Sequence, residues 1–349
     1  MILKKFDKTL LVCSIILMGF GTAVIGSVAP SLVGSQILFY IAGLGLFFLF
    51  SQIDPRIYKS VWKQTYVISI ILLLMTLALG LESRGATRWI SLAGFRLQFS
   101  EILKPFLMIS LAALISFQQE SKFKNFLYFL IIGAIPMFLI FKQPDLGSAL
   151  VYLAGSSFMI FVSGINLWYI FSVLISFVIF LPVAWHFLAQ YQKDRIFSFI
   201  NPQVDPLGIS YNAIQAVIAV GSGMFFGKGL GLGTQSQLLF LPEHHTDFIF
   251  ASTAEELGFL GAGLLLIVYF ILIMKIFKNA GATKDSFVRL LIVSLGAMIF
   301  AQVFINVGMN LGILPVTGIT LPLVSYGGSS ILSVMISLGI ISGAYCFNE

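Results

Sequence analysis

Long apolar runs alternate with short polar segments along most of this chain. A helix of about 20 apolar residues crosses the hydrocarbon core of a bilayer. Ten runs are close to this length, and they predict an all-α polytopic membrane protein with about ten transmembrane helices. Their approximate bounds are 9–28, 36–53, 63–81, 101–118, 124–141, 146–163, 166–186, 250–277, 286–311 and 324–346.

The composition supports this interpretation and places one large loop. Of the 349 residues, 58% are hydrophobic and only 10% are charged. We expect a single transmembrane domain over 1–349, with an extracytoplasmic loop at about 187–249 between spans seven and eight. That loop is too apolar and aromatic to be disordered, and a short helix is predicted near Tyr211 to Val220.

The net charge of +6 does not indicate nucleic acid as a partner, because the basic residues mostly flank the predicted helices. Basic residues beside membrane spans orient a protein in the bilayer. With ten spans both termini lie on one side, which carries 12 of the 20 Lys and Arg residues. The bias predicts cytoplasmic termini.

The densest polar cluster lies in the segment Leu241–Gly258, just before an apolar run. Ionisable residues at a membrane are costly, and their usual explanation is functional. A helix cap would explain one polar residue but not this group. The ionisable members are Glu243, His244, His245, Asp247, Glu255 and Glu256.

Small residues follow this cluster at helical spacing. Asp247, Ala251, Ala254, Gly258 and Gly261 would fall near one helix face. This strip predicts either a seam for close helix packing or a groove for a lipid tail whose headgroup meets Asp247. A zinc site at the adjacent histidines is disfavoured, because catalytic zinc needs three protein ligands.

Two further polar groups lie at predicted span ends. Glu101 and Lys104 are three residues apart and would share a helical face. They either neutralise each other or line a polar cavity, and we favour the cavity. Asp145 follows Pro144 at the start of a span, where it either caps the helix or supplies a second carboxylate to the outer site.

Basic residues on the predicted outer side are candidates for binding phosphate, with ordinary headgroup contact as the alternative. They include Arg88, Arg195 and Lys228. Lys228 lies in the glycine-rich run 221–234, whose spacing does not match a phosphate-binding P-loop. A loop that allows close backbone approach is the simpler interpretation. The segment 306–330, rich in glycine and proline, predicts a re-entrant stretch.

Together these motifs resemble the SEDS family (shape, elongation, division and sporulation proteins) over nearly the whole chain. Within that family, Gln143–Gly147 and the segment 233–238 are more similar to the cell-elongation member RodA than to the cell-division member FtsW. The motifs are Glu101–Pro105, Gln143–Gly147, Asn201–Pro202, Asp205–Pro206, Gly227–Gly229, Leu241–Gly258, Leu314–Gly318 and Ser325–Ser330.

The resemblance implies a peptidoglycan glycosyltransferase that polymerises lipid II on the outer face of the bacterial cytoplasmic membrane. It assigns the essential carboxylate to Asp247 and adds His245 and Ser325 to the substrate-binding candidates. The expected partners are a class B penicillin-binding protein, lipid II and membrane lipids. A divalent cation, Mg²⁺ or Mn²⁺, is implied by analogy.

The chemical hypothesis is an inverting displacement with Asp247 as general base. Lys104, Arg88, Arg195 or a cation would stabilise the charge that develops on the pyrophosphate leaving group. Two other functions remain open. One is a flippase or transporter for the lipid-linked precursor, whose charges should lie near the bilayer midplane. The other is a non-catalytic scaffold for a penicillin-binding protein.

Overall fold

The computed structural model describes most of the chain. The described residues are 6–83, 86–92, 95–117, 123–166, 168–169, 171–172, 175, 179, 186, 193–194, 197, 199–201, 208 and 210–347. Arg195 and most of the seventh predicted span lie outside them.

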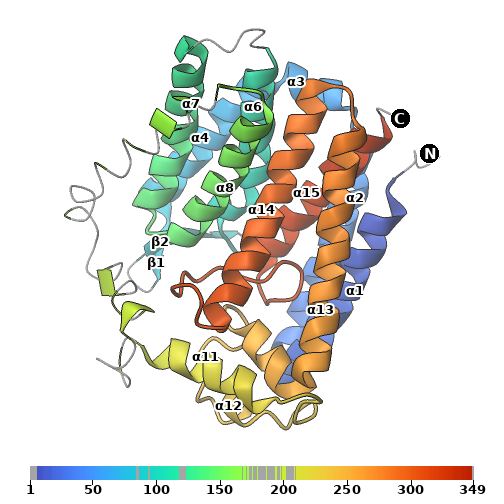
Figure 1. Ribbon diagram of the computed structural model, residues 1–349, viewed down its shortest axis with the longest axis vertical. Coiled ribbons are helices and arrows are strands. Elements are labelled where there is room, and N and C mark those ends of the chain that lie inside the picture. Colours follow the sequence, from blue (N-terminus) through green and yellow to red (C-terminus); the bar gives the residue numbers. More distant parts are fainter. Residues whose placement is uncertain are drawn as a thin grey trace.

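Long helices packed side by side form the protein (Figure 1). Within the described residues, eight helices are long and apolar enough to cross a membrane, and α8 is a shorter apolar helix. Nine of the ten predicted spans therefore correspond to a helix or a helix pair. The helices are α1 (Lys8–Val28), α2 (Val33–Ser51), α4 (Trp62–Leu79), α5 (Phe99–Ile102) with α6 (Lys104–Ser116), α7 (Phe123–Lys142), α8 (Leu146–Val162), α13 (Ile249–Ala282), α14 (Ser286–Asn310) and α15 (Gly328–Cys346).

Short elements connect these helices. The segment after α4 forms an antiparallel sheet in which Leu81 pairs with Trp89 and Ile90 with Leu97. These residues lie between the predicted spans 63–81 and 101–118, and the sequence interpretation missed the sheet because two of its strands have only three residues. The predicted helix near Tyr211 is confirmed as α11. The connecting elements are η1 (Pro30–Leu32), α3 (Pro55–Ser60), β1 (Leu81–Ser83), β2 (Ala86–Leu92), β3 (Phe95–Leu97), α11 (Tyr211–Ser222) and α12 (Thr234–Gln237).

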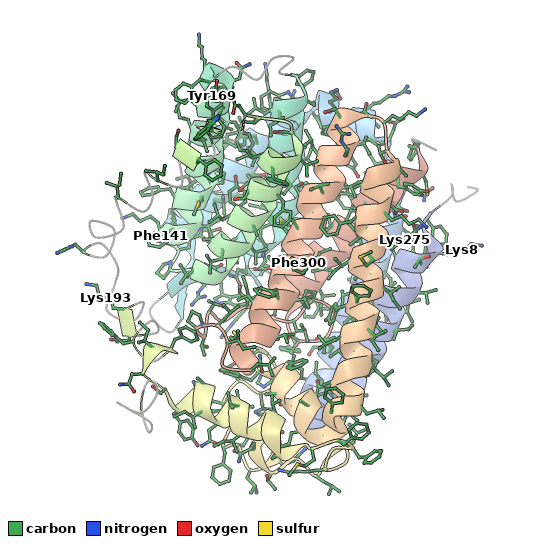
Figure 2. The ribbon with its side chains drawn as sticks, in the orientation of Figure 1. Lys8, Phe141, Tyr169, Lys193, Lys275 and Phe300 are labelled. Atoms are coloured by element: carbon green, nitrogen blue, oxygen red, sulfur yellow. The ribbon has the colours of Figure 1, made fainter. Side chains whose placement is uncertain are left out.

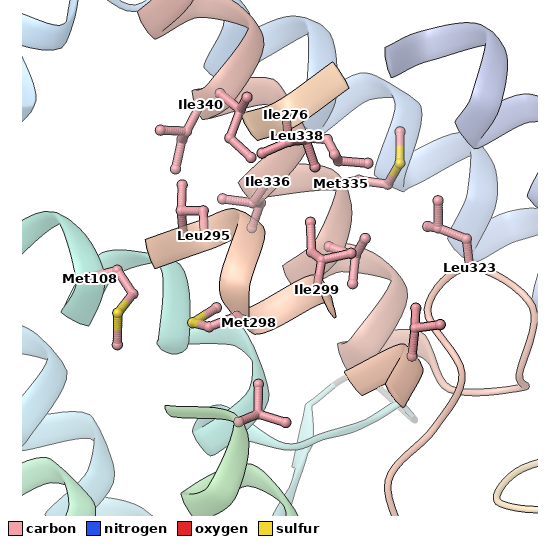
Figure 3. Close-up of a cluster of buried hydrophobic side chains, with 14 of the residues drawn as sticks. Met108, Ile276, Leu295, Met298, Ile299, Leu323, Met335, Ile336, Leu338 and Ile340 are labelled. Atoms are coloured by element: carbon pink, nitrogen blue, oxygen red, sulfur yellow. The ribbon is translucent and has the colours of Figure 1, made fainter. Parts of the chain in front are cut away.

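The core is built around α14 and α15, which are buried over most of their length, whereas α2, α4 and α7 bury about a fifth of theirs. A helix that is apolar on all sides can lie in the protein core or at the lipid-facing surface, because lipid and protein interior are both apolar. Figure 3 shows Leu295, Met298 and Ile299 of α14 close to Ile336 of α15 and Met108 of α6.

The two ends of the bundle differ. At one end the Asp7 main-chain N–H donates to Ser342 Oγ at 2.8 Å, and the Asp7 carboxylate contacts Lys275 Nζ at 3.0 Å. Lys8 and Lys275 lie on this side, near the two termini (Figure 2). The strands, α11 and α12 lie toward the opposite end (Figure 1). The predicted polar site belongs to this second end.

Helix α13 is interrupted at Gly258, where φ is 67° and ψ is −169°. The glycine-rich loop packs against the break and supplies main-chain hydrogen bonds. Phe259 N–H donates to Met224 O at 2.9 Å, and Lys228 N–H donates to Glu255 O at 3.0 Å. Ala251, Ala254 and Gly258 are buried, which favours the packing seam over the lipid-tail groove. Asp247 does not continue this face, because α13 begins at Ile249.

Candidate active site

Asp247 lies in the turn-rich segment 241–248 that leads into α13, and it is partly exposed. Its neighbour is the non-helical stretch 311–327, which confirms the irregular part of the predicted re-entrant segment. A Cβ added at Gly318 would lie 3.5 Å from Asp247 Oδ2, and Gly318 has a φ of +78° that disfavours other residues. The carboxylate therefore borders the non-helical stretch 311–327.

Partners from distant segments hold the main chain before Asp247. Ser325 Oγ donates to Thr246 O at 2.6 Å, and Tyr326 N–H donates to His245 O at 2.9 Å. Ser252 Oγ donates to His244 O at 3.2 Å. The Asp247 carbonyl accepts from two asparagines of α14, Asn306 at 2.9 Å and Asn310 at 3.1 Å. Four consecutive carbonyls are thus fixed by side chains or main chain outside the turn.

The two histidines of this segment have different surroundings. His244 is buried, and its Nδ1 and Nε2 lie 3.0 and 3.2 Å from the carbonyl oxygens of Leu241 and Val28. It therefore links the turn to the end of α1. His245 is partly exposed, with its ring centroid 6.0 Å from that of Tyr326. His245 lies two residues before Asp247 in the same turn, and substrate binding by it stays a prediction.

A second polar cluster joins α5, α6 and α8. Lys104 Nζ contacts Glu101 Oε1 at 2.6 Å, which confirms the expected pair, and Lys104 is only 1% exposed. Ser148 Oγ donates to the same carboxylate oxygen at 2.6 Å. Asp145 caps α8 by accepting from Ser148 N–H at 3.1 Å, and it also accepts from Ser100 Oγ. Glu101, which is 13% exposed, therefore forms one polar group with the buried residues Lys104 and Asp145.

The start of α15 connects the two clusters. Ser329 Oγ accepts from Gln98 N–H at 2.8 Å, and Ser333 Oγ donates to Glu101 O at 2.7 Å. Ser325 and Tyr326, just before this helix, hold the turn that carries Asp247. One segment therefore fixes both polar clusters at the same end of the bundle.

The remaining predicted residues lie elsewhere. Lys228 Nζ contacts buried Glu255 at 2.8 Å and donates to Thr234 Oγ1 at 2.8 Å, so its observed contacts are structural. Ser325 is 2% exposed and supports the turn. Arg88 lies on β2, and its Nε is buried without a hydrogen-bond partner among the described residues. Direct substrate binding by these residues stays a prediction.

Within the described part of the chain, no three His, Cys, Asp or Glu side chains gather in a way that would hold a metal ion. The sequence interpretation also missed the roles of Asn306 and Asn310. Their spacing of four residues places them on one face of α14, but nothing in the local sequence indicates which main-chain group they contact.

Comparison with known proteins gives consistent matches along the whole chain. Residues 7–348 match the family model FTSW_RODA_SPOVE, described as cell cycle protein. The peptidoglycan glycosyltransferase MrdB of Escherichia coli strain K12 is 40% identical over 341 residues, covering 96% of this chain and 92% of the relative. A probable peptidoglycan glycosyltransferase FtsW from Trichlorobacter lovleyi is 34% identical, covering 97% and 93%.

Solved structures share the fold. A chain from a study of how a peptidoglycan synthase complex coordinates polymerization and crosslinking aligns with a TM-score of 0.84 at 30% identity, covering 97% of both chains. The rod shape determining protein RodA of Thermus thermophilus aligns with a TM-score of 0.74 at 27% identity, covering 97% of this chain and 96% of that one. An aspartate-to-alanine variant of the same protein aligns with a TM-score of 0.75 at 28% identity, covering 97% of both.

Proposed function

Since this chain belongs to the FtsW/RodA/SpoVE family and is a peptidoglycan glycosyltransferase of RodA type, we propose that it polymerises lipid II with Asp247 as the general base. The site would face the outside of the bacterial cytoplasmic membrane and act during cell elongation. The supporting observation is the position of Asp247. It is partly exposed and sits on a turn whose carbonyls are fixed from several segments.

In the proposed reaction, the 4-hydroxyl oxygen of the acceptor sugar forms a bond to the donor anomeric carbon. The bond from that carbon to the pyrophosphate oxygen breaks, and undecaprenyl pyrophosphate leaves with the electron pair. Asp247 accepts the hydroxyl proton, which requires hydrogen-bond reach of that hydroxyl. One carboxylate suffices, because a single inverting displacement forms no covalent intermediate with the protein.

Charge that develops on the leaving pyrophosphate needs a stabilising partner. We assign this role to Lys104, Arg88 or Arg195, with a bound cation as the alternative. Lys104 is buried beside Glu101, so it would act as part of the Glu101–Lys104–Asp145 cluster rather than as a free cation. The described residues form no metal site of their own. The divalent cation therefore stays a prediction from the resemblance, and no step here depends on it.

The proposal includes an orientation and partners. The end that carries the chain termini would be cytoplasmic, as the charge bias along the sequence predicts. A class B penicillin-binding protein would be the transpeptidase partner, in line with the peptidoglycan synthase complex that shares the fold. The other partners would be lipid II and membrane lipids, with no role for nucleic acid.

Replacing Asp247 by asparagine tests the proposal. Purified Asp247→Asn in detergent or liposomes should be folded. Its rate of lipid II polymerisation should be lower by a factor of about 100 or more, which is the scale of a lost general base. The matched control is Asp54→Asn, because Asp54 caps α3 at the opposite end of the bundle and asparagine also caps helices. Polymer length distributions on gels give the measurement.

Undiminished glycan synthesis by Asp247→Asn would falsify the general-base role. Transfer of labelled lipid II across liposomes by the unmodified protein, with no polymer formed, would support the transporter instead. Normal cell elongation with Asp247→Ala would support the scaffold.

A further inference from the structure

The side chain of Asn310 caps the first turn of α13, where the N-cap residue Phe248 makes no side-chain hydrogen bond. Ala251 is the third residue of this helix, so its N–H has no acceptor within the helix. Here Ala251 N–H donates to Asn310 Oδ1 at 3.0 Å, and Asn310 Nδ2 donates to Asp247 O at 3.1 Å. The asparagine amide is inserted between the two main-chain groups. The bond from Ser252 N–H to Phe248 O, at 3.1 Å, follows directly.

Asn306 completes the arrangement one turn earlier on α14. Its Nδ2 donates to Asp247 O at 2.9 Å and to Ile319 O at 2.7 Å, so it joins the turn to the non-helical stretch 311–327. Asn310 Nδ2 also donates to Asn306 O at 2.8 Å. Both asparagines are fully buried. Each therefore has partners for both amide hydrogens, and neither is available for another role without breaking these bonds.

We propose that Asn306 and Asn310 are positioning residues that hold Asp247 just outside α13 and fix the direction of its carboxylate. The inference rests on the proposed role of Asp247 as general base. Without the Asn310 amide, the Ala251 N–H and the Asp247 carbonyl could bond each other directly, which would extend α13 at its N-terminus. Asp247 would then join the helix face of Ala251 and Ala254, which is buried against protein.

This rearrangement would matter because a general base must lie within hydrogen-bond reach of the proton it removes. A displacement of about 1 Å can cost on the order of 100-fold in rate. The other contacts of the turn, through Ser325 and Tyr326, do not involve the Asp247 carbonyl. Among the contacts described, the asparagines are therefore the direct link between α14 and Asp247.

A purely structural role makes a different prediction. The same hydrogen bonds also join α13 to α14, and their loss would destabilise the protein without changing turnover by the folded fraction. Asn279 provides the matched control. It is 1% exposed and donates to Asp7 Oδ2 at 2.9 Å, so it also joins distant segments, but at the end of α13 far from Asp247.

The experiment compares Asn306→Ala, Asn310→Ala and Asn279→Ala in a lipid II polymerisation assay, with thermal unfolding measured on the same preparations. We expect kcat to fall roughly 10- to 100-fold in the first two variants, with KM changed by less than about threefold. Asn279→Ala should unfold at a lower temperature but keep its kcat. Asn306→Ser and Asn310→Ser, which retain a small polar group, replace any alanine variant that does not fold.

Unchanged kcat in the Asn306 and Asn310 variants would overturn the positioning role. The result separates two failures. If Asp247→Asn is inactive while the asparagine variants keep full kcat, only the positioning inference fails. If Asp247→Asn itself remains active, the general-base proposal fails, whatever the asparagine variants do.

Discussion

Asp247 and the pair Glu255 and Glu256 lie within ten residues of one another, yet their carboxylates differ in burial and in hydrogen bonding. Glu255 is fully buried and accepts from Lys228 Nζ at 2.8 Å and from Ser236 Oγ at 2.7 Å. Glu256 is 1% exposed. Asp247 is partly exposed, and the atom held by α14 is its main-chain carbonyl. A cluster that looks uniform in sequence thus contains two kinds of site.

The glutamates attach the glycine-rich loop to the break in α13. Glu255 holds the segment 234–236, and Glu256 Oε1 accepts from Ser27 Oγ at 2.6 Å and Gly231 N–H at 3.1 Å. The loop can approach closely because Gly223 and Gly227 lack side chains; a Cβ at Gly227 would lie 2.2 Å from Glu256 O. These acids are therefore part of the scaffold, whereas Asp247 is partly exposed.

The largest effect on stability is expected for Glu255→Gln. The change removes the partner of Lys228 and places an amide where main-chain and hydroxyl donors now point. Breaking a buried ion pair costs about 3–5 kcal/mol, and we expect about 3 kcal/mol because Lys228 is 27% exposed and keeps access to water. Chemical denaturation in mixed micelles measures this loss in the free energy of unfolding.

Polymerase turnover by the folded fraction of Glu255→Gln should stay within a fewfold of the unmodified protein. If Glu255→Gln had normal stability but no polymerase turnover, Glu255 would take part in the reaction. The contrast between Glu255 as a scaffold residue and Asp247 as the general base would then be wrong.

A smaller loss is expected for Gly258→Ala, which tests the break itself. The φ of 67° and ψ of −169° are nearly exclusive to glycine, and such strain costs about 1–3 kcal/mol. The added Cβ would also lie 2.2 Å from Gly227 N, so the loop must move. Gly263→Ala is the control, since nothing lies within 4 Å of its added Cβ. Limited proteolysis of the glycine-rich loop should accelerate only in Gly258→Ala.

The transmembrane architecture was predictable because a bilayer imposes length and polarity on each span. The predicted bounds 9–28 and 286–311 differ by one residue from α1 and α14. The pair of Glu101 and Lys104 was predictable for a similar reason, since helical spacing brings residues three apart together.

What the sequence did not reveal depends on contacts between distant segments. The break at Gly258 requires the loop at 224–229 to supply its hydrogen bonds. The insertion of Asn310 into the first turn of α13 joins residues 59 positions apart. Helical spacing alone placed Asp247 on the α13 face, because a local pattern cannot show that a side chain from another helix will cap the first turn after Asp247.

The smallest effect is expected for Glu256→Gln, the closest counterpart to Asp247→Asn on the scaffold side. Glu256 Oε1 already accepts both described hydrogen bonds, and Oε2 is buried with no hydrogen-bond partner among the described residues. Glutamine keeps the accepting oxygen and places its NH2 group at the second position. Because that NH2 group gains no acceptor among the described residues, we expect a loss of about 1 kcal/mol in the free energy of unfolding, with unaltered polymerisation. Carboxylate-to-amide exchange would then be tolerated at position 256 and disabling at position 247, although both residues begin as acids in one short segment. Loss of polymerisation in well-folded Glu256→Gln would show instead that the two acids act together.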